Sequence, residues 1–196
     1  MASVAVAELA SKVRTFCTPH PRRNLPIVSS RRRAENQFSR AFQRAFVASQ
    51  KSQGVGGHEF EANGYGIADF VWAAFATTRS LTVSRTSEPF LGKTKLMAFE
   101  MKLNDWSRAI QQAYRYTYFA DQSIVVLPTT AAKVARRQLA LLREMRVGLW
   151  GFDKCNGQIV KYFTPRTHCP RNPAARDRAL DLLCRRFDLC RPPKDL

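Results

Sequence analysis

Two charged residues lie close together in an otherwise apolar stretch, and their spacing suits chemistry on an anionic substrate. The run 95–103 (KLMAFEMKL) predicts a strand, in which every second side chain shares a face. One face carries Leu96, Ala98, Glu100 and Lys102, and the other carries Met97, Phe99, Met101 and Leu103. Charges at the end of an apolar face are costly unless they are paired, solvated or bound to a metal. Glu100 and Lys102 therefore mark a candidate site, although a solvated ion pair would have the same sequence.

Other polar residues in ordered segments can join this pair. Asp69 is the one charge in the apolar run 66–77 (GIADFVWAAFAT), which predicts a central strand covered on both faces. Gln112 and Tyr116 are four residues apart in a predicted helix over 106–119, so they share one face of it. Glu35 falls in the first turn of a predicted helix over 34–50. It either complements the helix dipole there or points into a site beside the strands.

The charge balance indicates a polyanionic partner. The 196 residues contain 32 Lys and Arg against 15 Asp and Glu, a formal net charge of +17. Nucleic acid is the commonest partner of so basic a protein, although a ribosome, an acidic protein or an anionic membrane surface would also satisfy the charge. The length predicts one domain, and a hydrophobic fraction of 45% indicates a folded chain.

The five cysteines and the hydropathy predict a cytoplasmic protein that does not enter a membrane. An odd number of cysteines without a Cys-x-x-Cys spacing argues against both a disulfide framework and a zinc ribbon. Reduced thiols are the simpler interpretation. No apolar run approaches the roughly 18 to 20 residues that a membrane span requires.

Hydrophobic periodicity predicts an α/β (α+β) fold with a single mixed sheet flanked by helices. We expect a short helix over 2–16, a basic N-terminal arm up to residue 33, and a folded domain over 34–196. The glycine-rich segment 52–57 is expected to be a turn. The predicted strands cover 58–62, 66–77, 95–103, 123–127, 147–152 and 158–163. The predicted helices of the domain cover 34–50, 106–119, 130–146 and 174–189.

The ordered set of motifs resembles the PD-(D/E)XK nuclease superfamily, whose restriction-endonuclease-like fold has an αβββαβ core. The resemblance covers about residues 34–152. It lies in GIADF around Asp69, in AFEMK with Glu100 and Lys102, and in QAYRY, whose Gln112 and Tyr116 match the motif of the RecB-like branch. Glu35 matches an acidic residue on the first helix of the superfamily. Ala68 replaces the usual proline before the aspartate.

The resemblance implies a Mg²⁺- or Mn²⁺-dependent hydrolase acting on DNA. Asp69, Glu100 and the backbone carbonyl of Met101 would hold the cation, and Lys102 would assist the attacking water. Gln112, Tyr116 and Glu35 would complete the site. Salt-sensitive phosphate contacts would come from the arm and from the helix over 130–146, through Arg31, Arg32, Arg33, Lys133, Arg136, Arg137 and Arg143.

Two other functions remain open at this point. The first is a nuclease-like fold that has lost catalysis and serves as a nucleic-acid-binding or assembly module. The second is a basic structural protein in which the Glu-x-Lys spacing is accidental. Many small nucleases of this fold act as dimers, and the sequence neither requires nor excludes a homodimer.

Overall fold

A single mixed β-sheet organises the part of the chain that the computed structural model describes, which is residues 14–17, 30–50, 54–62, 64–75 and 94–186. Within these residues seven strands follow one another across the sheet in chain order. They are β1 (Arg14–Cys17), β2 (Gly54–Ala62), β3 (Gly66–Phe75), β4 (Thr94–Met101), β5 (Gln122–Pro128), β6 (Val147–Phe152) and β7 (Ile159–Phe163). The pairs β1–β2, β4–β5 and β5–β6 are parallel, and the others are antiparallel.

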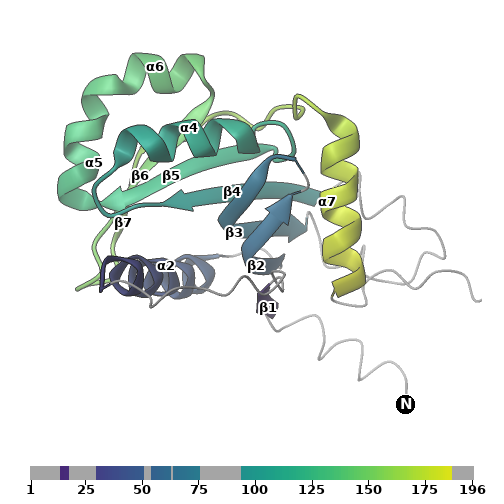
Figure 1. The fold of residues 1–196 in the computed structure, drawn as a ribbon, viewed down its shortest axis with the longest axis horizontal. Helices are drawn as coiled ribbons and strands as arrows, with labels where there is room; N and C mark the ends of the chain where they lie inside the picture. Colours follow the sequence, from purple (N-terminus) through teal and green to yellow (C-terminus); the bar gives the residue numbers. More distant parts are fainter. Residues whose placement is uncertain (1–13, 18–29, 51–53, 63, 76–93, 187–196) are drawn as a thin grey trace, which may run out of the picture.

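Helices cover both faces of this sheet (Figure 1). They are α2 (Ser30–Ser49), α4 (Trp106–Tyr116), α5 (Thr129–Ala135), the short 3₁₀ helix η2 (Arg136–Gln138), α6 (Leu139–Glu144) and α7 (Pro173–Arg186). The order α2, β2, β3, β4, α4, β5 confirms the predicted order of helix, three strands, helix and strand. The mixed α/β fold class is therefore confirmed.

The side chains of β4 alternate between the two faces of the sheet as predicted, so β4 contributes to both halves of the core. Met97, Phe99 and Met101 of β4 belong to a core under α2, where Phe42 and Phe46 also pack. Aromatic rings dominate this side, and the Phe46 ring lies 4.9 Å from the Phe99 ring in an edge-to-face contact. Such pairs lock α2 against the sheet.

The other half of the core lies under α4 to α7. Leu96 and Ala98 of β4 pack there with Ala109 and Ala113 of α4. Alanines at this contact let α4 approach the sheet closely. Glu100 extends the same face of β4, so the fold directs its side chain toward α4 at the end of the strand.

The N-terminal boundaries differ from those expected. The predicted helix over 2–16 is wrong at residues 14–16, which lie in β1 and pair with β2, while residues 2–13 lie outside the described part. The helix expected from residue 34 begins at Ser30 and runs through Arg31, Arg32 and Arg33. Arginine has nearly the helix propensity of alanine, so the basic run continues the helix instead of ending it.

Residues 54–57 of the glycine-rich segment lie in a strand and not in the expected turn, while residues 52 and 53 lie outside the described part. Gly54 and Gly56 lie in β2 beside the large rings of β3. A Cβ on Gly54 would meet the Trp72 ring at 2.3 Å, and one on Gly56 would meet the Phe70 ring at 2.7 Å. The glycines are needed here because the rings occupy their side-chain space, not because the backbone turns.

The basic helix expected over 130–146 is interrupted. It starts at Thr129 and breaks at η2, which separates α5 from α6. Val134, at the end of α5, is exposed, whereas Leu142 of α6 is buried. A 3₁₀ helix has fewer residues per turn than an α-helix, so η2 changes the direction in which the side chains after it point. Helix α6 can then place Leu142 in the core. The strands predicted over 147–152 and 158–163 are confirmed as β6 and β7, which pair antiparallel.

Candidate functional site

Glu100 and Lys102 form an ion pair at the end of β4. The Lys102 Nζ atom lies 2.8 Å from the Glu100 Oε1 atom, and the Glu100 side chain is only 1% exposed. Burial raises the pKa of Glu100, and the nearby ammonium only partly offsets this. Burial alone would lower the pKa of Lys102, but the carboxylates of Glu100 and Asp69 outweigh it, so the net pKa is raised. Lys102 is therefore an ammonium group at neutral pH.

Asp69 lies beside this pair, where β3 and β4 stop exchanging backbone hydrogen bonds. Their ladder reaches the Phe70–Phe99 pair, and the next amide of β4 on this side, Met101 N–H, donates to Asp69 Oδ2 at 2.7 Å. Burial, followed by the charge of Glu100, raises the pKa of Asp69 to about 7. The two carboxyl groups are therefore close enough to oppose each other's ionisation.

Tyr116 joins the site from the last turn of α4. Its hydroxyl lies 2.5 Å from Glu100 Oε2 and 2.7 Å from the Ile67 carbonyl oxygen. Burial raises the pKa of Tyr116 far above its usual range, so the phenol keeps its single proton. The hydroxyl faces both acceptors, so the two contacts share one proton.

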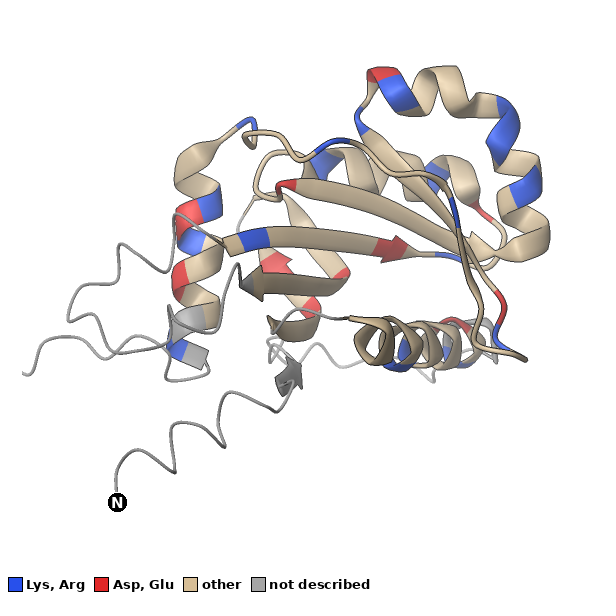
Figure 2. Cartoon of the chain, turned by 180° about the vertical axis from the view of Figure 1, so that it is seen from behind, with Lys and Arg blue, Asp and Glu red and all other residues tan. Residues whose placement is uncertain are grey.

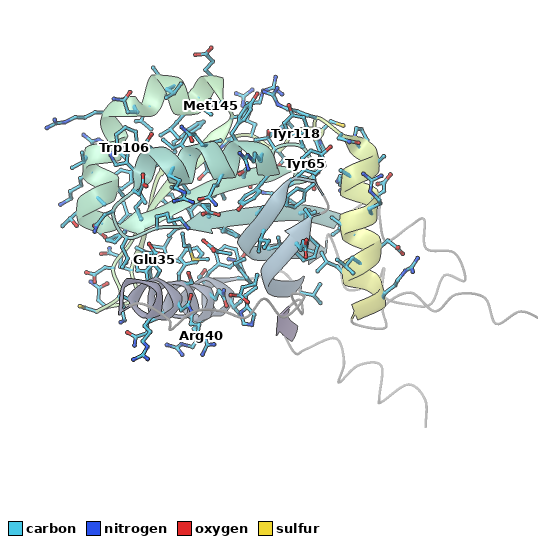
Figure 3. All side chains as sticks on the ribbon, in the orientation of Figure 1. Glu35, Arg40, Tyr65, Trp106, Tyr118 and Met145 are labelled. Carbon is cyan, nitrogen blue, oxygen red and sulfur yellow. The ribbon has the colours of Figure 1, made fainter. Side chains whose placement is uncertain are left out.

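The other two residues expected in the site are Glu35 and Gln112, and each has different surroundings. Glu35 lies on the side of α2 that faces the sheet (Figure 3), and its negative charge raises the pKa of Asp69, Glu100 and Lys102. Since α2 begins at Ser30, Glu35 is beyond the first turn, and the helix-dipole interpretation is wrong. The Gln112 Oε1 atom is buried and has no hydrogen-bond partner in the described part of the chain.

The expected phosphate-binding residues lie on segments that begin near the same end of the sheet. Because β5 is parallel to β4 and leads directly into α5, α5 starts at the end of the sheet where Glu100 lies. Lysine and arginine follow one another over α5, η2 and α6 (Figure 2). The exposed residues are Arg33, Lys133, Arg136, Arg137 and Arg143. Arg31 and Arg32 lie in α2, but their side chains are outside the described part.

A divalent cation fits the charge of this site but would find few protein ligands. Asp69, Glu100 and Glu35 place three carboxyl groups around one ammonium, and burial is the main reason why the pKa values of Asp69 and Glu100 are raised. In the described residues no three His, Cys, Asp or Glu side chains converge as a ready-made metal site. Mg²⁺ suits such a site, because it binds through one or two carboxylates and keeps several waters.

The stability of the protein should fall as the pH rises from about 4 to about 7 in the presence of a chelator. Asp69 has a model-peptide pKa of 3.8 and a folded pKa of about 7. The folded state therefore holds a proton that the unfolded state releases, and this stability is lost as the pH passes the folded pKa. At about 1.4 kcal/mol per unit, the loss is on the order of 4 kcal/mol. Urea unfolding at pH 5 and pH 8 spans about two of these units and should show a loss of about 3 kcal/mol.

Asp69→Asn provides the control for this pH effect, because an amide does not titrate. Its unfolding free energy should change less between pH 5 and pH 8 than that of the wild type. Glu100, whose pKa is also raised, accounts for the remaining slope. Mn²⁺ should restore stability at pH 8 more than at pH 5, because it competes with the bound protons. Equal slopes for wild type and variant would contradict a buried, protonated Asp69.

A second buried ion pair, which the sequence reasoning missed, fastens the opposite end of β4. Arg176 of α7 donates from Nε to Asp121 Oδ1 at 2.8 Å and from a terminal nitrogen to the Thr94 carbonyl at 2.6 Å. Asp121 Oδ2 also accepts the Leu96 amide at 2.7 Å. Asp121 is followed by Gln122 and Ser123 before the apolar run 124–127, so its charge interrupts no apolar pattern and the local sequence did not single it out.

No protein-family model, curated protein or solved structure matches this chain. The resemblance to the nuclease superfamily therefore rests on the sequence motifs alone. None of the helices in the described ranges has the length and apolar composition needed to cross a bilayer.

Proposed function

We propose that this chain is a PD-(D/E)XK-type nuclease that hydrolyses phosphodiester bonds in DNA with the help of Mg²⁺ or Mn²⁺. The observation that carries the proposal is the grouping of Asp69, Glu100, Lys102 and Tyr116 at one end of the sheet, next to basic helices. A net charge of +17 favours a nucleic-acid substrate.

Each residue has a distinct role in this proposal. Asp69, Glu100 and the Met101 carbonyl would hold the cation, which supplies an activated water and polarises a phosphoryl oxygen. Lys102 remains an ammonium next to Glu100, so it orients the attacking water and offsets charge on the phosphate. Tyr116 fixes the rotamer of Glu100 through its hydroxyl. The exposed arginines of η2 and α6 bind the substrate backbone.

The free thiols of Cys155 and Cys169 favour a cytoplasmic location. A homodimer is compatible with the proposal but is not needed to complete the site.

The alternative is a binding or assembly module without catalysis. The observation that favours it is the absence, within the described residues, of a converged set of three metal-binding side chains. The two functions differ in turnover, whereas both predict binding to nucleic acid.

Cleavage of end-labelled DNA tests the proposal. Single-stranded, duplex and branched substrates and an RNA oligonucleotide would be incubated with Mg²⁺, Mn²⁺ or EDTA. The wild type should cleave DNA only with a cation, and Asp69→Asn should lose at least about 100-fold in rate. Asp105→Asn is the matched control, because it also removes one carboxylate but keeps an N-cap for α4. DNA binding without cleavage under every condition would support the alternative.

A further inference from the structure

A cluster of three tyrosines and one arginine lies at the far end of α4, on residues that the proposed function does not use. The Tyr65 and Tyr118 rings are stacked with centroids 5.2 Å apart, and Tyr114 meets Tyr118 edge-on at 6.4 Å. The Arg171 guanidinium lies over Tyr114 at 4.9 Å and over Tyr118 at 5.8 Å. Figure 3 shows Tyr65 and Tyr118 next to each other beside the end of α4. We call this group the tyrosine–arginine cluster.

Backbone hydrogen bonds hold the cluster in a fixed shape. Arg171 N–H donates to the Thr117 carbonyl at 3.1 Å, and Asn172 N–H donates to the Tyr118 carbonyl at 2.9 Å. The Asn172 side-chain amide donates to the Tyr65 hydroxyl at 2.7 Å. The loop before α7 is thereby fastened to α4 and to the β2–β3 hairpin. Such a preformed surface binds a ligand without first having to be ordered.

The cluster remains accessible and carries an unneutralised positive charge. Arg171 is exposed, the three tyrosines are partly exposed, and none of the ion pairs in the described part of the chain involves Arg171. Arg115, three residues before Tyr118 on the outer face of α4, is exposed as well. An arginine stacked on rings leaves its N–H groups directed outward, where they can bind a phosphate.

The cluster is joined to the candidate site through two short segments. Tyr118 follows Tyr116 by two residues, and Tyr65 precedes Ile67 by two. Tyr116 and Ile67 are themselves linked by the 2.7 Å hydrogen bond of the tyrosine hydroxyl.

We propose that the tyrosine–arginine cluster binds an unpaired segment of nucleic acid, with a base packed against the partly exposed tyrosine rings and a phosphate on Arg171. Aromatic rings bind single strands because the faces of unpaired bases are free, whereas those of a duplex are covered by their neighbours. This inference rests on the proposed nucleic-acid substrate and narrows it to one with a single-stranded part, such as a free strand, an end or a flap.

Binding measured in EDTA tests the inference without cleavage. Fluorescence anisotropy would compare single-stranded and duplex DNA on the wild type, Arg171→Ala and Arg178→Ala. Arg178 is an exposed arginine of α7, so its replacement removes the same charge. Arg171→Ala should weaken single-strand binding about tenfold and duplex binding about threefold, while Arg178→Ala stays within about twofold. Equal effects of the two substitutions would overturn the inference.

Base stacking can be measured separately through the fluorescence of a single strand that contains 2-aminopurine. Its fluorescence should be quenched by the wild type and by Tyr118→Phe, which keeps the ring, but much less by Tyr118→Leu. If Tyr118→Leu does not fold, Arg171→Lys, which keeps the charge without the planar stacking group, should still lose about threefold in single-strand affinity. A lowered melting temperature with unchanged binding would show that the cluster only fastens the loop, and would overturn the inference.

These outcomes separate the two proposals. If substitutions at Arg171 and Tyr118 leave DNA cleavage unchanged, this inference is wrong but the nuclease proposal is unaffected. If the cluster binds single strands but the protein does not cleave DNA, the nuclease proposal is wrong and this inference is unaffected.

Discussion

Glu100→Gln should reduce DNA cleavage by at least about 1,000-fold without lowering the stability of the protein. The substitution keeps the shape of the side chain but removes the negative charge that the proposed cation and Lys102 require. It also removes a carboxyl group that is 1% exposed and whose pKa is raised by burial. At pH 8, where ionising that group is costly, the free energy of unfolding should stay the same or increase. Single-turnover cleavage and urea unfolding measure the two effects.

Glu144→Gln is the matched control, because Glu144 is an exposed glutamate on α6. It should leave both cleavage and unfolding close to the wild-type values. A Glu100→Gln protein that is folded and still cleaves at the wild-type rate would show that the site lies elsewhere. A variant that loses stability along with activity would instead indicate that the ion pair with Lys102 holds β4 in place.

Arg176→Ala should destabilise the protein by about 3 to 5 kcal/mol. Removing this guanidinium would leave the carboxylate of Asp121, whose side chain is 7% exposed, as an unpaired buried charge. The Thr94 carbonyl would lose its contact as well. Urea unfolding at neutral pH measures the loss.

Helix α7 provides its own control for this effect. Arg185 forms a similar pair with Asp181, at 2.9 Å, but the two side chains are 76% and 51% exposed. Arg185→Ala should therefore cost only about 0.3 to 0.5 kcal/mol. Replacing both Asp121 and Arg176 by apolar residues should restore part of the stability lost in Arg176→Ala. Equal costs for the two arginines would mean that burial does not determine the strength of these pairs.

The sequence predicted the central part of the fold because local patterns decide it. Alternation in β4 assigned Phe99 and Ala98 to opposite faces, and both lie in the expected halves of the core. The errors came where a distant contact overrides the local pattern. Nothing near Gly54 indicates that the Trp72 ring fills its side-chain space, and nothing near Val134 indicates a 3₁₀ turn after it. Both depend on which elements meet in space.

For the candidate site, sequence reasoning singled out the residues but not their contacts. Asp69 and Glu100 were conspicuous because a charge in an apolar run breaks the pattern of its strand. That Asp69 would accept the Met101 amide, and that Tyr116 would also contact the Ile67 carbonyl, depends on the register of β3 against β4 and on the placement of α4. Register and helix placement are set by packing, so spacing alone could not supply them.

The order of the strands in the sheet is also the order in which a ribosome makes them. In the described part of the chain each strand pairs only with the strands made just before and just after it, so the sheet can grow at one edge as the chain emerges. Asp121 enters this growing sheet 55 residues before its partner Arg176 is synthesised. Until α7 has emerged, this carboxylate can stay hydrated, and the arrival of Arg176 completes the enclosure of β4. During synthesis, the buried charge at this end of β4 would thus be neutralised when α7 emerges.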